Sequence, residues 1–137
     1  MAMASLNYLA ILVGAIIFMV LGYLWYGPLF SKPWLAALGK TQEEIAAQGG
    51  NMAATYGLTF LGALVTTTVL GIIIYGMGQT TALNGAHMGV LLWVGFVAPS
   101  SLGSVLFEGR PSKLYVIHNS YYLVTLALVG ALLGAWQ

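Results

Sequence analysis

The sequence contains no cysteine and very little charge. Of its 137 residues, four are Lys or Arg and three are Asp or Glu, so charged residues make up 5% of the chain, against about 25% in soluble domains. Without cysteine there is no disulfide, no thiolate nucleophile and no Cys-ligated metal or iron–sulfur site. A net charge of +1 offers no basic surface for nucleic acid. The lack of charge also excludes a water-soluble globule.

Apolar residues are abundant instead. They account for 60% of the chain, and the mean hydropathy is +0.91. A helix that spans a bilayer needs about 20 mostly apolar residues, and four such runs are present, at about 5–26, 52–75, 83–107 and 111–136. We therefore expect an all-α, polytopic membrane protein in which residues 1–137 form a single membrane domain, a bundle of four transmembrane helices.

A more polar stretch follows the first run. Gly27-Pro28 is expected to end that span, because proline lacks an N–H and clashes with the preceding turn. Residues 31–51 are expected to form a short interfacial element on the bilayer surface, with Pro33 at a first helical position and Thr41-Gln-Glu-Glu44 as a capping box. Aromatic residues are expected to anchor the chain at the membrane interfaces. These anchors are Trp25, Tyr26, Trp34 and Trp136.

Several strings of residues resemble those of a known family. Trp25-Tyr-Gly-Pro-Leu-Phe-Ser-Lys-Pro-Trp34 closes the first span, Phe107-Glu-Gly-Arg-Pro111 joins the third to the fourth, and Gly130-Ala-Leu-Leu-Gly-Ala-Trp136 ends the last. With these motifs the chain resembles a family of small four-helix bacterial membrane proteins catalogued only as a domain of unknown function. The resemblance covers nearly the whole chain. It implies a fold and a location, and it assigns no catalytic role to any residue.

Groups that could carry chemistry inside the spans are few. No acidic residue lies within a predicted span, which disfavours a proton-coupled exporter because such proteins use a membrane carboxylate. Apart from tyrosines, His87 and His118 are the ionisable residues at membrane depth. No nucleophile–base pair, phosphate loop or metal triad is recognisable. We therefore expect no enzyme activity, no metal site and no cofactor, and we expect no nucleic-acid partner.

Polar residues of three spans are expected at one depth in the membrane. Counting from Pro111 at 1.5 Å per residue, His118 lies about 10 Å inside the span, and Ser101 and Thr59 reach the same depth from their own span ends. Either a small polar pocket or a layer of interhelical hydrogen bonds fits this pattern. Tyr122, one turn after His118, faces the same way. The candidate pocket comprises His118, Asn119, Tyr122, Ser100, Ser101 and Thr59.

Small residues repeat at helical spacing on one face of the fourth span, at Ala127, Gly130, Ala131 and Gly134. Such a face allows close helix packing, and the sequence does not tell whether the neighbouring helix belongs to the same chain. The leading hypothesis is an interaction or accessory subunit that packs in a homo-oligomer or a larger membrane complex. Its partners are then the lipid bilayer and a second copy or another membrane protein.

Two alternatives remain open at this point. The first is an oligomeric transporter or channel for a small neutral solute, with the His118 layer as its site. The second is binding of a haem or pigment through His118 or His87, since neutral imidazole is a common axial ligand. His87 is predicted in the opposite half of the membrane from His118, so a single haem cannot take both histidines from one chain.

The four basic residues define an orientation. Lys32 and Lys40 follow the first span, and Arg110 and Lys113 lie between the third and fourth. With four spans these two loops share a side, which the positive-inside rule makes cytoplasmic. We therefore expect a multi-pass protein of the cytoplasmic (inner) membrane with both termini external.

This topology predicts which of two compartment-specific reporters is active at each of three fusion points. A fusion at Lys40 should be active with a cytoplasmic reporter, and fusions at Gln79 and Gln137 should be active with a reporter that works only outside. Paired reporters with opposite compartment requirements, measured on the same fusion points, provide the internal control. The inverse pattern would overturn the orientation.

Overall fold

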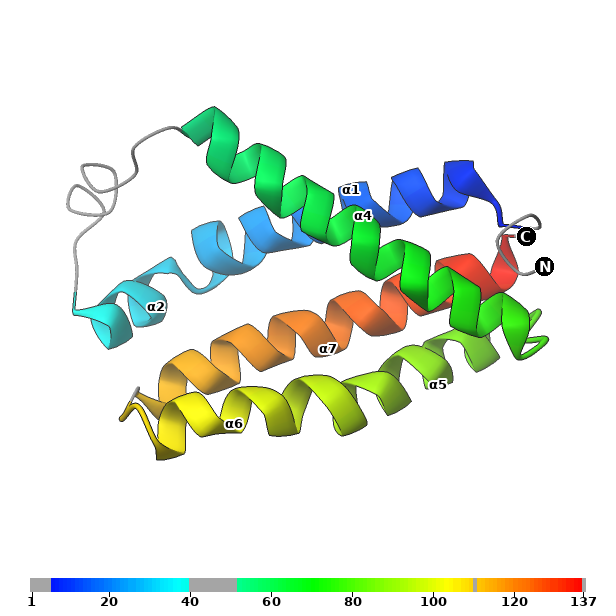
Figure 1. Ribbon diagram of the computed structural model, residues 1–137. Helices are drawn as coiled ribbons and strands as arrows, with labels where there is room; N and C mark the ends of the chain where they lie inside the picture. Colours follow the sequence, from blue (N-terminus) through cyan, green and yellow to red (C-terminus); the bar gives the residue numbers. More distant parts are fainter. Residues whose placement is uncertain (1–5, 40–51, 110, 137) are drawn as a thin grey trace.

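The structure, a computed structural model, describes residues 6–39, 52–109 and 111–136. Every regular element in these ranges is helical (Figure 1), which confirms the all-α fold. In chain order the elements are α1 (Tyr8–Leu24), η2 (Trp25–Leu29), α2 (Ser31–Leu38), α4 (Met52–Gly76), α5 (Ala82–Leu92), η3 (Trp93–Val97), α6 (Ala98–Leu106) and α7 (Ser112–Ala135). The two η elements are turns of π-helix, in which the backbone is wider than in an α-helix.

Among the described residues, four helical stretches are long and apolar enough to cross a membrane. They run over Tyr8–Leu29, Ala53–Gly76, Ala82–Leu106 and Ser112–Ala135. Two of them are composite, because η2 extends α1 and η3 joins α5 to α6. The protein is thus a multi-pass membrane protein.

The helix of the first span ends at Leu29, one residue after the predicted stop at Gly27-Pro28. Pro28 lies inside η2, where the Phe30 N–H donates to the Trp25 carbonyl at 3.0 Å, a reach of five residues. Proline offers no N–H, and a π-turn leaves a backbone group unpaired in any case, so the wide turn accommodates it. The chain then continues as α2, which ends at Gly39 with a φ of 72°. The predicted capping box at 41–44 lies outside the described residues.

The tightest helix contact joins α5 to α7 through glycines. Gly85 and Gly89 of α5 lie against Gly130 and Gly134 of α7. A Cβ atom built at Gly130 would overlap with the carbonyl oxygen of Gly85, and one built at Gly85 would overlap with that of Gly130. Only residues without a side chain allow backbones to approach this closely. The small-residue face of α7 is therefore used within the chain.

Helices α1, α4 and α7 share a closed core at the end of the bundle where α1 begins and α7 finishes (Figure 1). Ala10, Ile74, Val129 and Leu133 are fully buried there. The Trp136 carbonyl accepts hydrogen bonds from Asn7 Nδ2 at 3.3 Å and from the Tyr75 hydroxyl at 3.4 Å. These bonds join the ends of three helices, so this half of the bundle is closed.

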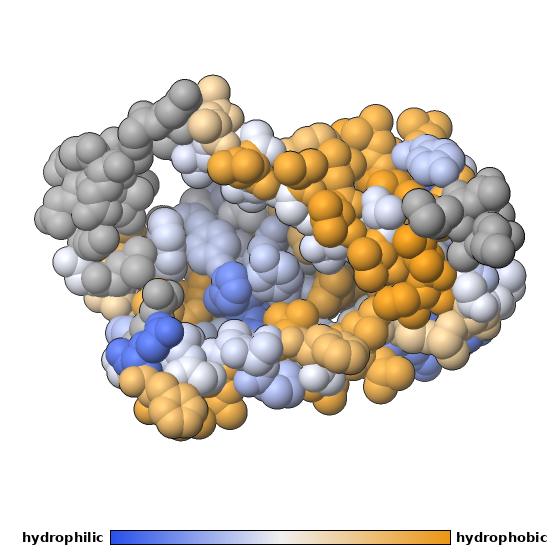
Figure 2. All heavy atoms as spheres, viewed as in Figure 1, coloured by the Kyte–Doolittle hydropathy of each residue, from blue (hydrophilic) through white to orange (hydrophobic). Residues whose placement is uncertain are grey.

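Among the described residues the opposite half is open, because α4 crosses the bundle obliquely (Figure 1). Its first turns diverge from α6 and α7 (Figure 1), and the side chains of residues 53–59 are exposed. Figure 2 shows a hollow on this face, with hydrophilic and intermediate residues inside it and hydrophobic residues covering the closed end. The bundle thus has one packed half and one half that contains a cleft.

The glycine contact predicts a sharp effect of a single methyl group. Gly130→Ala should lower the stability of the protein by about 1–3 kcal/mol, because the new Cβ forces two backbones apart. Gly62→Ala is the matched control, since nothing lies within 4 Å of a Cβ built at Gly62, and alanine favours helix. Unfolding of both variants in mixed micelles measures the difference. Equal stabilities of the two variants would contradict the contact.

Candidate functional site

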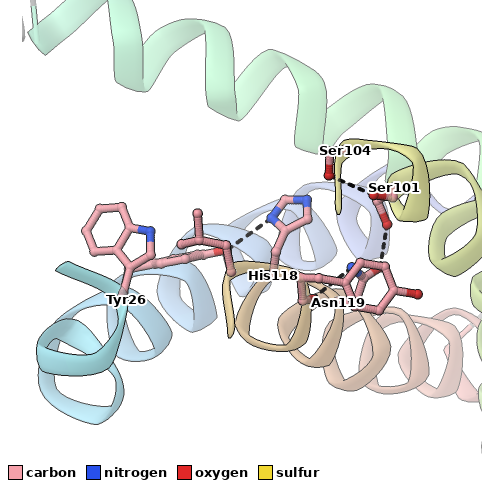
Figure 3. Close-up of a pocket in the computed structure, with 8 residues that line it drawn as sticks. Tyr26, Ser101, Ser104, His118 and Asn119 are labelled. Carbon is pink, nitrogen blue, oxygen red and sulfur yellow. Dashed lines mark hydrogen bonds between the residues drawn. The ribbon is translucent and has the colours of Figure 1, made fainter. Parts of the chain in front are cut away.

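Two hollows in the open half share one wall. The larger, of about 580 Å³, lies between α1, α4 and α7, and the smaller, of about 270 Å³, lies between α2, α6 and α7. Tyr26, Trp34 and His118 line both. We call the two hollows together the His118 cleft. Figure 3 shows the smaller hollow, with residues from η2, α6 and α7 converging on it.

The shared wall is a hydrogen-bonded pair. The Tyr26 hydroxyl lies 3.1 Å from His118 Nδ1 (Figure 3). Tyr26 belongs to η2, so the π-turn positions the phenol over α7. The rings pack edge to face around the pair, with Tyr26 and Trp34 centroids 5.0 Å apart and His118 and Tyr122 centroids 4.8 Å apart. The His118 imidazole is thus held between two tyrosines.

Asn119 holds α6 against α7 behind this wall. Its side chain is 3% exposed, its Oδ1 accepts from the Ser101 hydroxyl at 2.9 Å, and its Nδ2 donates to the Tyr115 carbonyl at 2.9 Å. The Asn119 carbonyl also accepts from the Trp93 indole at 2.9 Å. Buried polar groups in a membrane need such partners, so these contacts satisfy Asn119 structurally.

Hydroxyl groups also satisfy the backbone beside η3. Tyr115 donates to the Ala98 carbonyl at 2.9 Å. The Ser101 hydroxyl has one proton, which it donates either to the Val97 carbonyl at 2.8 Å or to Asn119 Oδ1. Pro99, in the first turn of α6, removes one N–H from this region. The polar layer predicted from the sequence therefore has one part that supports the backbone and another part, around His118, that lines the cleft.

On the other side of the cleft, α7 is bonded to the first span. The Tyr121 hydroxyl donates to the Phe18 carbonyl at 2.7 Å, and the Trp25 indole donates to the Ser120 hydroxyl at 3.1 Å. Tyr121 also packs against Tyr26 and Tyr122. The sequence analysis placed Tyr122 on the same face as His118 and did not include Tyr121 in the candidate pocket, whereas both rings line the larger hollow.

The structure brings most of the predicted pocket residues together. His118, Asn119 and Ser101 line the smaller hollow, and His118, Tyr122 and Thr59 line the larger one. Ser100 differs: it is exposed, and its hydroxyl donates to the Phe96 carbonyl of its own helix at 2.5 Å. Depth counting places Ser100 and Ser101 at nearly the same level, but it gives no rotation about the helix axis.

The residues predicted for helix packing, for interface anchoring and for ligation are distributed as follows. Gly130 and Gly134 contact α5, with Ala127 beside Gly89, and Ala131 is partly buried. Of the expected anchors, Trp25, Tyr26 and Trp34 turn toward α7, while Trp136 lies at the closed end, 38% exposed. His87 is exposed on α5 and does not line the His118 cleft.

Sequence reasoning missed many residues of the cleft, and four of them line the smaller hollow beside His118: Tyr26, Trp34, Ser104 and Tyr115. Three of them are aromatic residues near a span end, where the interface preference of Trp and Tyr offered a sufficient explanation. Ser104 lies one turn after Ser101, and its hydroxyl donates to the Ser101 carbonyl at 2.8 Å. The helical spacing of these two serines was the available signal.

The described residues that line the cleft include no Lys, Arg, Asp or Glu. Aromatic rings, hydroxyls, one amide and one imidazole remain. Such a lining can bind a flat or apolar group and form a small number of hydrogen bonds. It presents neither the charge for a phosphate nor a carboxylate for a cation.

The comparisons with known proteins give a family and no activity. Residues 9–134 match the family model described as "Protein of unknown function (DUF1761)". The chain belongs to this family, which confirms the resemblance to small membrane proteins of unknown function. Neither the curated proteins nor the solved structures contain a match.

The bond between Tyr121 and α1 predicts a measurable loss. Tyr121→Phe should destabilise the bundle by about 1 kcal/mol, because it removes an interhelical hydrogen bond and leaves the ring in place. Tyr23→Phe is the matched control, since Tyr23 is 72% exposed. Reversible unfolding in mixed micelles compares the two. A loss of the same size in both variants would show that the Tyr121 bond contributes nothing specific.

Proposed function

We propose that this membrane protein binds a small amphipathic molecule, which enters the His118 cleft from the bilayer. The observation that carries the proposal is the wall of Tyr26, Trp34 and His118 shared by two hollows. Polar side chains at membrane depth are costly, and they commonly mark functional sites. Concave, largely apolar walls with a few polar groups are also typical of small-molecule sites.

The closed half of the bundle supports binding rather than conduction by a single chain. Beyond the cleft, Thr67, Leu70 and Thr125 are at most 2% exposed, and Val129 and Leu133 are fully buried. A solute that entered the cleft would meet this packed core. Transport of a small neutral solute would therefore need a second chain or a large rearrangement, whereas binding needs neither.

The role as an interaction or accessory subunit ranks second. The lack of acidic residues in the spans, the interfacial aromatic residues and the small-residue faces motivated it, and the small-residue face of α7 contacts α5 of the same chain. The same contact leaves no free glycine face on α7 for a homo-oligomer. We retain the inference from the charge distribution that the chain lies in the inner membrane with both termini external, which places the open half at the cytoplasmic side. Within this proposal the protein binds its ligand without catalysis.

Haem or pigment binding is decided by the same preparation that tests the proposal. His118 Nδ1 lies beside Tyr26, so a macrocycle would have to use Nε2. An absorption spectrum of protein purified from native membranes detects any such pigment. If a haem or pigment band is present and disappears in His118→Phe, the ligand of the cleft is a macrocycle and not a small amphipathic molecule.

Filling the cleft predicts loss of the bound molecule. Gly22 lines the larger hollow, and a Cβ built there would lie 3.4 Å from the Tyr121 hydroxyl. Gly22→Phe should therefore place a ring in the ligand's volume. We expect organic extracts of the wild-type protein, analysed by mass spectrometry, to contain one enriched small molecule, reduced about tenfold in the variant, which corresponds to about 1.4 kcal/mol.

Gly62→Phe is the control for this experiment. It makes the same substitution where nothing lies within 4 Å of the added Cβ, so its extract should match the wild-type extract. Thermal unfolding establishes that both variants are folded. An extract with no enriched molecule, or with equal amounts in Gly22→Phe and Gly62→Phe, would overturn the proposal.

A further inference from the structure

A third hollow lies beside the His118 cleft, on the other side of Tyr122. It is a groove of about 380 Å³ between α4, η3 and α7, and it shares Tyr122 with the larger hollow. We call it the α4–η3 groove. Its lining is almost entirely apolar and includes Val65, Val69, Leu92, Phe96, Val97 and Leu126. The cleft thus offers a ring-lined compartment with a few polar groups, and the groove beside it offers an apolar one.

This order of compartments matches a molecule with a compact head group and an apolar chain. The groove lies farther along α4 and α7 from the open end than Thr59 and His118 do, so it extends toward the middle of the bundle. A head group in the cleft would therefore place its chain in the groove. Because the molecule comes from the bilayer, van der Waals packing of its chain against the groove, rather than transfer from water, holds the chain there.

The lining of the cleft selects among head groups. A phospholipid phosphate calls for Lys or Arg, and the described lining residues include neither. The rings of Tyr26, Trp34, Tyr121 and Tyr122 instead surround the larger hollow. Aromatic side chains bind flat rings by offset-stacked and edge-to-face contacts. A neutral, planar head group fits this lining better than a zwitterion does.

The pair of Tyr26 and His118 adds a hydrogen-bond donor. With neutral imidazole, either the phenol donates to Nδ1 and leaves the Nε2–H, or Nδ1–H donates to the phenol oxygen and leaves the phenol O–H. In both tautomers one proton of the pair is left to donate to a ligand. A carbonyl oxygen on the ring would accept it. The pair thus favours a ring that carries acceptors.

We propose that the molecule bound in the His118 cleft is a prenylated ring with carbonyl acceptors, that is, a membrane quinone. The ring lies among Tyr26, Trp34 and Tyr122, a carbonyl accepts from the Tyr26–His118 pair, and the isoprenoid chain occupies the α4–η3 groove. This inference rests on the proposed function, because it names the ligand class of the same cleft. It concerns binding and involves no electron transfer.

The test uses decylubiquinone, a quinone with a ten-carbon chain, on the full chain in detergent. Trp34 lines the cleft, and quinones quench indole fluorescence at short range, so saturable quenching reports binding. Replacing both members of the pair, Tyr26→Phe with His118→Phe, keeps two rings and removes the donor. We expect about tenfold weaker binding in this double variant, which corresponds to about 1.4 kcal/mol.

The α4–η3 groove, which would hold the isoprenoid chain, is tested by its own variant and control. Val69→Phe narrows the α4–η3 groove. Val20→Phe is the control, because Val20 is an exposed residue of α1 that lines neither compartment. The two valines are 49% and 51% exposed, so the substitutions are matched. Val69→Phe should weaken binding of decylubiquinone at least about fivefold, and Val20→Phe should leave it unchanged. Thermal unfolding of each variant separates weak binding from misfolding.

Two outcomes would overturn the inference. Equal, non-saturating quenching in the wild type and all variants would mean that the quinone only partitions into the micelle. Saturable binding that the double variant and Val69→Phe leave unchanged would place the quinone elsewhere. If quinone binding fails while mass spectrometry still finds a molecule that Gly22→Phe removes, the quinone assignment is wrong and the proposed function stands. If both experiments fail, both the quinone assignment and the proposed function are wrong.

Discussion

The contact between α5 and α7 constrains the rest of the bundle. Because Gly85 and Gly89 lie against Gly130 and Gly134, these two helices approach backbone to backbone, and α7 has little room left for other neighbours on that face. Helices α1 and α4 therefore pack on its other side. At the closed end all three meet around Val129 and Leu133, while α4 diverges toward the open end. The cleft lies where α4 diverges from α7, at the opposite end from this packed core.

The two π-turns set the chemistry of the open half. Each begins with tryptophan and has glycine at its third position, Trp25-Tyr-Gly in η2 and Trp93-Val-Gly in η3. The two indoles donate to neighbouring residues of α7, Trp25 to the Ser120 hydroxyl and Trp93 to the Asn119 carbonyl. Both composite spans are thereby fixed to the same turn of α7, next to His118. π-Turns often occur at functional sites, and here they position the residues that form the cleft.

Hydropathy and charge were sufficient to predict the fold class and four spans, because hydrocarbon requires long apolar helices whatever the detailed packing. The π-turn that contains Pro28 was not predictable from Gly27-Pro28 alone. Whether proline ends a helix or lies within a π-turn depends on tertiary partners such as Ser120, which bonds the adjacent Trp25. The sequence gives no sign of that partner.

For the candidate site, the sequence predicted how deep each residue lies in the membrane but not which way its side chain points around the helix axis. A rise of about 1.5 Å per residue places Thr59, Ser101 and His118 at one level, and all three line the cleft. The same reasoning included Ser100, which faces outward. It also left out Tyr26 and Trp34, because an aromatic residue near a span end has equal reason to face lipid or protein. Only the packing of α2 and η2 against α7 distinguishes these orientations.

The polar groups of the open half differ in how completely the chain itself satisfies them. Asn119 uses both side-chain atoms and its carbonyl within the protein, and the hydroxyls of Ser101, Tyr115 and Tyr121 each donate to a helix backbone or an amide. These groups stabilise the bundle. The Tyr26–His118 pair retains hydrogen-bonding capacity toward the cleft in either tautomer. Because such capacity is costly at membrane depth, its position on the wall shared by two hollows is the strongest physical reason to assign the cleft to a ligand.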